Sequence, residues 1–109
     1  MLLEEWLEKI LNGEKTIEIV HESAGHLVGK KIFLCMSGSF KVYGTAIVQS
    51  SKLIETASQW DELRPMHCVP GPRMYRHSHA WNLTSVQRIT PIPIMRKRGS
   101  IRIQKGPGP

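Results

Sequence analysis

Lys15 and Glu18 are the residues of this sequence whose types and spacing best suit chemistry. Glu18 is the polar middle of the alternating segment Ile17-Glu18-Ile19, and Lys15 comes just before it. The pattern predicts a strand on which Glu18 points away from Ile17 and Ile19, with Lys15 close to it. A lysine and a carboxylate in one cleft can bind a phosphate and a base edge, or can shift each other's pKa for proton transfer. The alternative is a surface ion pair of little energetic weight.

A second group of candidate residues is aromatic or basic and lies mainly after residue 65. Trp81 can stack on a base, which contributes about 1 to 3 kcal/mol per base, or it can pack in the core; both interpretations stay open. The Pro- and Gly-rich residues 65–77 predict a long loop, and long loops in small domains are often functional. The further candidates for contacts with a ligand are Thr16, His21, Arg73, Tyr75, Arg76 and His79.

Four potential metal ligands lie in or beside this loop: His67, Cys68, His77 and His79. The adjacent pair His67 and Cys68 cannot readily both reach one tetrahedral ion, and the overall spacing matches no closed zinc site. We therefore expect no metal and no other cofactor. We also expect Cys35 and Cys68 to be free thiols, because a single disulfide has little support in a chain without a secretion signal.

The charge is distributed very unevenly along the chain. Residues 1–22 hold six acidic residues and two lysines, whereas the 46 residues from Arg64 onward hold nine Lys or Arg and no acidic residue. An acid-free stretch of this length creates a positive field that attracts polyanions, of which nucleic acid is the obvious one. The alternative is a solvated basic face that keeps the protein soluble.

The hydrophobic pattern at the N-terminus predicts an amphipathic helix, since apolar residues recur at spacings of three and four. They are Leu2, Leu3, Trp6, Leu7, Ile10 and Leu11. Asn12-Gly13 is expected to end this helix, because glycine tolerates a positive φ. Residues 16–20 and 31–36 predict strands, and residues 40–48, interrupted at Gly44, predict a hairpin partner for the second of them.

The remaining sequence predicts one short helix and more strands. Ser58 has the Ser-x-x-acid spacing of a helix N-cap, and Pro65 is expected to stop that helix. Residues 79–94 are expected to be extended and residues 100–104 to form a last strand, followed by a flexible tail at 105–109. Five to six short strands with two short helices predict a mainly β (α+β) fold, a small barrel formed by a single domain of residues 1–104.

The order of these elements is similar to that of the ASCH family of the PUA-like superfamily. The resemblance depends on Gly13-Glu14-Lys15-Thr16-Ile17-Glu18 after the helix and on Ala80-Trp81-Asn82-Leu83 in a later extended segment. It covers about residues 6–103 and implies a PUA-like β-barrel that binds RNA or a nucleoside in a cleft at its mouth.

One branch of that family hydrolyses N4-acylated cytidine with a Lys, a Thr and a Glu, and Lys15 matches its lysine. The threonine of that branch stands three residues after the lysine, where this chain has Glu18. The arginine that the family commonly places two residues after the glutamate is here Val20, followed by His21. These departures favour binding over the hydrolytic mechanism.

The sequence therefore predicts an RNA- or nucleoside-binding domain whose basic C-terminal half contacts phosphates. The alternatives are a metal-independent hydrolase of RNA or acylated cytidine, with Lys15 and Glu18 as catalytic groups, and an adaptor whose basic tail contacts an acidic protein. No apolar run approaches the roughly 20 residues that span a bilayer, and the acidic N-terminus lacks the positive flank of a signal peptide. We expect a soluble cytoplasmic protein that does not bind membranes.

Overall fold

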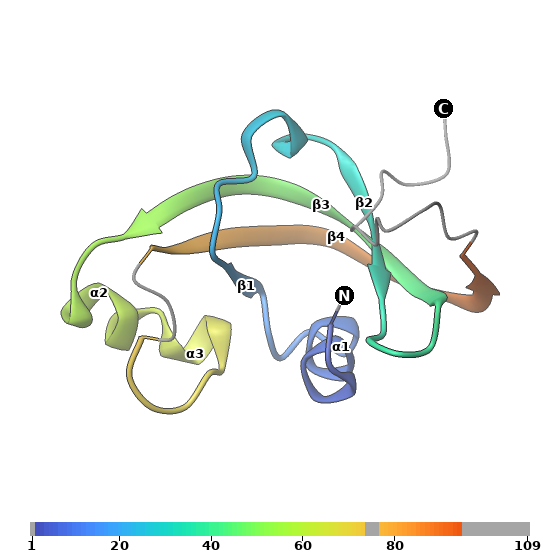
Figure 1. Ribbon diagram of the computed structural model, residues 1–109, viewed down its shortest axis with the longest axis horizontal. Helices are drawn as coiled ribbons and strands as arrows, with labels where there is room; N and C mark the ends of the chain where they lie inside the picture. The colour runs from blue at the N-terminus through green and yellow to red at the C-terminus, as the bar shows by residue number, and fades with distance from the viewer. Residues whose placement is uncertain (1, 74–76, 95–109) are drawn as a thin grey trace.

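The computed structural model describes residues 2–73 and 77–94, which form a mainly β fold with a few short helices (Figure 1). The elements follow in the order α1 (Glu4–Leu11), β1 (Ile17–Val20), the 3-10 helix η1 (Gly25–Leu27), β2 (Lys31–Cys35), β3 (Lys41–Ile54), α2 (Ala57–Glu62), α3 (Arg64–His67) and β4 (Ser78–Pro93). The four strands make one antiparallel sheet in the order β1-β4-β3-β2. The predicted α+β class is confirmed.

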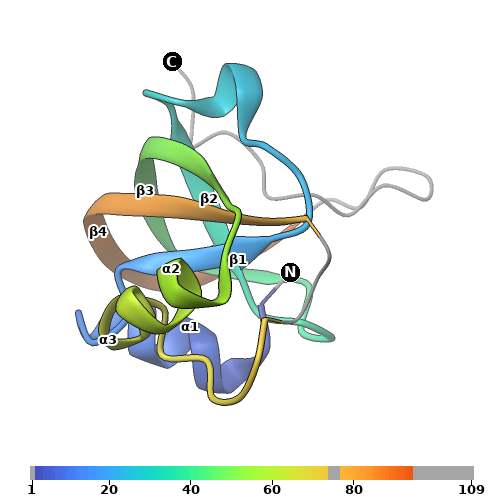
Figure 2. The ribbon, with the colours of Figure 1, turned by 90° about the vertical axis from the view of Figure 1, so that its left-hand side faces the viewer.

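The sheet is strongly curved, and its two long central strands β3 and β4 arch over the helices (Figures 1 and 2). We expected a closed barrel of five to six short strands, but the described residues form four strands in an open sheet with β1 and β2 at its edges. The expected segments 16–20, 31–36, 40–48 and 79–94 correspond to β1, β2, β3 and β4, and β3 continues to Ile54, beyond its expected end at residue 48. The expected strand 100–104 and the expected tail 105–109 lie outside the described residues.

The two faces of β1 pack against different sets of apolar residues. Ile17 and Ile19 belong to a cluster with Trp60 of α2 and Ala80 of β4. The other face of the sheet packs against α1 in a second, larger cluster: Leu2, Leu7, Ile10, Ala24, Ile32, Leu34, Ala46, Val48, Trp81 and Leu83. We call this the inner face, because the sheet curves around it. Glu18 is the register partner of Trp81, so it lies on the inner face, away from Ile17 and Ile19 as predicted.

The N-terminal helix is shorter than its hydrophobic pattern predicted. It begins at Glu4, and its buried residues are Leu7 and Ile10. Leu2 precedes the helix and is buried by a parallel bridge to Met36, while Leu3 is 61% exposed. The hydrophobic pattern assigned Leu2 to the helix because a leucine buried by a strand-like bridge cannot be distinguished, in the sequence, from a leucine on the buried side of a helix.

Gly44 is required by a close approach between α1 and the sheet. A Cβ atom at this position would lie 2.5 Å from Leu11 Cδ2 and 2.6 Å from the backbone oxygen of Gln87. The ladder between β3 and β4 shifts register here. β3 continues through this point instead of being interrupted, because glycine lets the backbone of β4 and the end of α1 come near at once.

The segment after β3 folds into two short helices where we expected one. The N-cap of α2 is Thr56, not Ser58, and its hydroxyl accepts a hydrogen bond from the backbone N–H of Gln59 in a capping box. Pro65 does not end the helical region, since it lies in the first turn of α3, where a missing N–H costs no hydrogen bond. The predicted loop 65–77 therefore starts only after His67.

Candidate functional site

Lys15 is buried at the junction of α1, β1 and α3, with 1% of its surface exposed. Its Nζ donates a hydrogen bond to the backbone carbonyl of His67 and lies 3.4 Å from Glu18 Oε1. The same atom lies 5.2 Å from the ring centroid of Trp6, a cation–π contact. The structure thus brings together the pair that the spacing pointed to, and the lysine is in the interior instead of on the surface.

Glu18 is the more accessible member of this pair, with 16% of its side chain exposed. Oε1 also accepts a hydrogen bond of 3.2 Å from the backbone N–H of Ile19. Burial raises the pKa of Glu18 and lowers the pKa of Lys15, and the attraction between the two charges opposes both shifts. The result is a desolvated ion pair, which is costly to form and sensitive to the loss of either partner.

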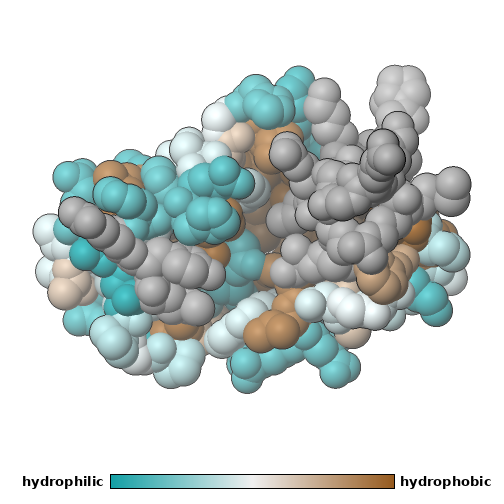
Figure 3. All heavy atoms as spheres, viewed as in Figure 1, coloured by the Kyte–Doolittle hydropathy of each residue, from teal (hydrophilic) through white to brown (hydrophobic). Residues whose placement is uncertain are grey.

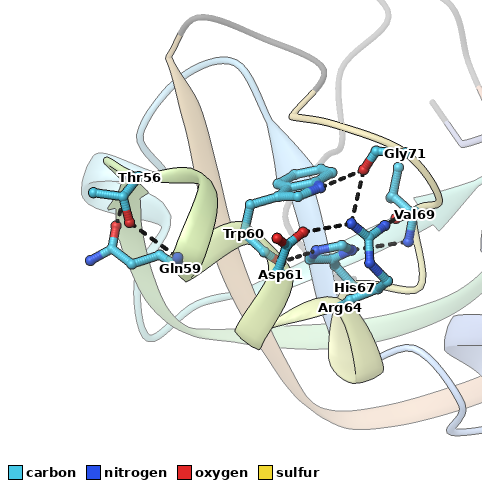
Figure 4. Close-up of polar contacts among 8 residues, drawn as sticks. All are labelled: Thr56, Gln59, Trp60, Asp61, Arg64, His67, Val69 and Gly71. Atoms are coloured by element: carbon cyan, nitrogen blue, oxygen red, sulfur yellow. Dashed lines mark hydrogen bonds and ion pairs between the residues drawn. The ribbon is translucent and has the colours of Figure 1, made fainter.

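His67 positions the carbonyl that holds Lys15, and its imidazole is fixed on both sides (Figure 4). Nδ1 accepts a hydrogen bond of 2.9 Å from the backbone N–H of Val69, so Nε2 carries the proton and donates to the carbonyl of Trp60, also at 2.9 Å. The imidazole lies against the Trp60 ring, with centroids 4.2 Å apart. Both ring nitrogens are therefore occupied by backbone groups, which leaves neither for a metal ion.

Arg64 completes this network by fixing the segment that follows α3 (Figure 4). Its guanidinium donates to the carbonyls of Val69 and Gly71 and pairs with Asp61 at 2.8 Å. The indole N–H of Trp60 also donates to the carbonyl of Gly71. We call Trp60, Arg64, His67 and the carbonyls they bind the α2–α3 network. This network fixes the position of the His67 carbonyl that binds Lys15.

The stability of the α2–α3 network is expected to depend on pH through His67. Burial lowers the pKa of this histidine below its ordinary 6.5, and Lys15 and Arg64 lower it further, against the opposing effects of the Trp60 carbonyl and Asp61. The unfolded chain then takes up the proton at a higher pH than the folded chain. The contribution of neutral His67 is fully present above about pH 6.5 and is lost as the pH falls through the folded-state pKa.

A comparison of wild type with His67→Asn tests this dependence, because asparagine retains an acceptor for the Val69 N–H. We expect the substitution to lower the free energy of unfolding by about 2 kcal/mol at pH 7.5 and by clearly less at pH 5, measured by urea denaturation. The raised pKa of Glu18 changes stability with pH in the opposite direction. Glu18 is present in both proteins, so its effect cancels in the difference between their free energies of unfolding. An equal or larger loss at pH 5 would contradict the assignment of a neutral His67.

Trp81 belongs to the inner-face core, which decides between the two interpretations that the sequence left open. It is 5% exposed, and its indole N–H donates to the carbonyl of Glu22 at 3.0 Å. The side chain belongs to the inner-face cluster of buried apolar residues. Trp81 therefore supports the site opposite Glu18 and does not present a free face for stacking.

The other candidate residues are more scattered. Thr16 and His21 are exposed at the two ends of β1. Arg73 donates to the carbonyl of Ile54 at 3.0 Å, which ties it to the end of β3. His79 is half-buried and shares the inner face with Glu18, since its register partner is Val20. Tyr75 and Arg76 lie outside the described residues.

Within the described residues, β1 and β2 are the edge strands of the sheet, and Figure 3 shows the surface on the side of these strands. This view, taken from the same side as Figure 1, shows a hollow near the middle of the molecule with apolar surface inside it. It lies between β1 and β2, in front of β3 and β4. Glu18 is on the face of β1 that turns toward the inner core, so its carboxylate is the acidic group of β1 on this side.

No family model matches the sequence, and a search of curated proteins gives no significant match. Among residues 2–73 and 77–94 there is no group of three or more His, Cys, Asp or Glu that could hold a metal ion. Cys35 and Cys68 are free. None of the helices in the described part of the chain is long and apolar enough to cross a membrane.

Two supporting residues of the site were missed by sequence reasoning. Trp6 was expected only to fill the core, although its ring also faces the Lys15 ammonium. His67 was considered only as a metal ligand, although it is its carbonyl that binds Lys15. Every residue has a backbone carbonyl, so no sequence signal distinguishes the carbonyl of His67. For Trp6, the presence of an aromatic residue on a helix that is followed by a lysine could have indicated a cation–π contact.

Proposed function

We propose that this protein is a binding module that takes up RNA, or one base or nucleoside of it, on the inner face of the sheet beside Glu18. The observation that carries the proposal is the buried Lys15–Glu18 pair, whose carboxylate is the partly exposed member and borders the open side of the sheet. A desolvated ion pair beside apolar surface contributes little to the stability of a fold, because removing both charges from water costs free energy. Buried charged groups with shifted pKa values are common where a protein binds a ligand.

We also propose that the fold is a PUA-like β-barrel of the ASCH type. A PUA-like β-barrel of the ASCH type has the helix, the Gly-x-Lys-Thr-x-Glu motif and the first strand in the order of α1, Gly13–Glu18 and β1. The curvature of the sheet and its open edges at β1 and β2 are compatible with closure by a further strand from residues 100–104. Closure of this kind would make the inner face beside Glu18 part of the mouth of the barrel.

The charge distribution supports a polyanionic ligand. The stretch from Arg64 onward is basic and acid-free, and phosphate contacts from Lys and Arg supply most of the affinity of non-specific nucleic-acid binding. Within the described residues of this stretch, Arg64 is held by the α2–α3 network and Arg88 pairs with Glu8 at 3.2 Å. Arg73 is bonded to the carbonyl of Ile54, so the phosphate contacts are proposed mainly for the basic residues beyond position 94.

Binding of a single-stranded RNA of about 20 nucleotides of mixed sequence, followed by fluorescence anisotropy between 20 and 200 mM salt, tests the proposal. We expect binding whose log affinity falls linearly with log salt, with a slope of about 0.7 for each phosphate contacted. Glu18→Gln should weaken binding several-fold, while Glu14→Gln, at the exposed pair with Lys9, should not. No detectable binding at the lowest salt would refute the proposal.

A hydrolase that acts on RNA or on acylated cytidine is the second candidate, favoured by the opposite pKa shifts of Lys15 and Glu18. A carboxyl that keeps its proton longer is suited to exchange it with a substrate, and the buried lysine beside it would adjust the pKa of that carboxyl. Incubation with N4-acetylcytidine and with labelled RNA separates the candidates. Turnover that is abolished in Glu18→Gln supports the hydrolase, and binding without turnover supports the module.

A further inference from the structure

The two carboxylate oxygens of Glu18 differ in their hydrogen-bond partners. Among the described residues, the donors that contact this carboxylate are Lys15 Nζ and the Ile19 N–H, and both contact Oε1. Two donors occupy the two lone pairs of that oxygen. Oε2 is left as an acceptor on a side chain that is 16% exposed.

Lys15 does not compete for the ligand, because its ammonium is turned away from the open side. It is 1% exposed and is held by the carbonyl of His67, by Glu18 and by the ring of Trp6. An incoming group at the inner face therefore meets a carboxylate oxygen, not an ammonium. A phosphate is repelled there, whereas an N–H donor gains a charge-assisted hydrogen bond.

The surroundings of the carboxylate restrict the ligand further. The residues nearest to Glu18 in the ladder on the inner face are Val20 beside it and Trp81 and His79 across from it. Leu83 continues the same face, and Trp81 and Leu83 are both part of the apolar core. A flat, mostly apolar group with an N–H at its edge fits an acceptor set in apolar surface better than a sugar or a phosphate does.

We propose that Glu18 Oε2 accepts a hydrogen bond from the exocyclic amino group of a base, so that cytosine, adenine or guanine is bound in preference to uracil. This inference rests on the proposed function. The amino groups of these bases donate hydrogen bonds, and a carboxylate accepting from the N4 amino group of cytosine is a known base contact. Uracil has a carbonyl oxygen at the corresponding position, whose lone pairs would face the carboxylate, and its one edge N–H, at N3, lies between two carbonyl oxygens, so uracil is disfavoured.

The test is displacement of the bound, labelled RNA by four free nucleosides that form two matched pairs. Cytidine and uridine differ at position 4 and in the proton on N3, whereas adenosine and purine riboside differ only in the amino group. We expect cytidine and adenosine to displace the RNA at concentrations at least about tenfold lower than their partners, the effect of one charge-assisted hydrogen bond. Glu18→Gln should remove most of the difference, since its amide can also donate, and Glu14→Gln should retain it.

The outcomes separate this inference from the proposed function. If RNA does not bind at all, the proposed function itself fails. If RNA binds and the paired nucleosides displace it equally, or uridine and purine riboside displace it better, the role of Glu18 is refuted while RNA binding stands. A preference that persists unchanged in Glu18→Gln would also overturn the inference, because the amino group would then be read elsewhere.

Discussion

Trp81→Ala is expected to lower the free energy of unfolding by about 4 kcal/mol, which is among the largest effects of a single substitution in this protein. The side chain is 5% exposed and fills the inner-face core between β1 and β3. Its removal leaves a large cavity that the curved sheet cannot close, because β4 is held by ladders on both sides. It also leaves the carbonyl of Glu22 without its donor. Urea denaturation with tryptophan fluorescence or circular dichroism measures the loss.

Two further variants make this prediction specific. Leu53→Ala removes an apolar side chain from β3 that is 42% exposed, and it should cost well under 1 kcal/mol. Trp81→Phe keeps an aromatic ring but loses the N–H bond to Glu22, so it should cost about 1 to 2 kcal/mol. If Trp81→Ala costs no more than Leu53→Ala, the ring is not part of the core, and stacking on a ligand becomes the better explanation of this residue.

The local features of this fold could be predicted because they depend on neighbours in sequence. The alternation of Ile17, Glu18 and Ile19 correctly predicted that the Glu18 carboxylate lies on the opposite face from the two isoleucines. A strand repeats every two residues, so a few residues are enough to recognise this pattern. The turn at Gly13 also agrees, with a φ of 88°. Both predictions use information within a few residues of the position in question.

The features that were mispredicted depend on distant partners or on a choice between similar signals. Thr56 and Ser58 are both acceptable N-caps, and the structure uses Thr56, which has Gln59 three residues later to complete the capping box. Leu2 is buried because Met36 lies beside it, which no periodicity reports.

The burial of Lys15 is the least predictable part of the site, and it decides the chemistry. The carbonyl that holds the ammonium belongs to His67, which is 52 residues away in sequence. That carbonyl is in place because α3 continues through Pro65 and because the His67 ring is fixed by Trp60 and Val69. The sequence indicated a Lys–Glu pair, but only the packing of α3 against β1 makes it an interior pair.

Lys15→Met is expected to lower the free energy of unfolding by about 3 kcal/mol, although methionine fills nearly the same space. The substitution leaves the Glu18 carboxylate in a poorly hydrated position without its counter-charge and removes the donor to the His67 carbonyl. It should also raise the pKa of Glu18 further, because Lys15 is the charge that lowers it. Urea denaturation at pH 7 measures the first effect, and the pH dependence of the loss reports the second.

The double variant Lys15→Met/Glu18→Leu separates the cost of an orphaned charge from the value of the pair. We expect it to recover most of the stability, since an apolar pair of similar volume often replaces a buried ion pair without loss. Lys9→Met is the matched control, because Lys9 forms an exposed pair with Glu14 at 3.5 Å and should contribute less than 1 kcal/mol. A double variant as unstable as Lys15→Met alone would mean that the lysine acts mainly through His67 and not through Glu18.

RNA binding by the double variant then connects stability with function. If the apolar pair is as stable as the wild-type pair, the fold does not need the charges, and their presence requires another explanation. A stable double variant that has lost the preference for amino-bearing nucleosides would place that explanation in ligand recognition by Glu18. A stable double variant that keeps both affinity and preference would show that Lys15 and Glu18 are dispensable for binding and would move the site to another part of the inner face.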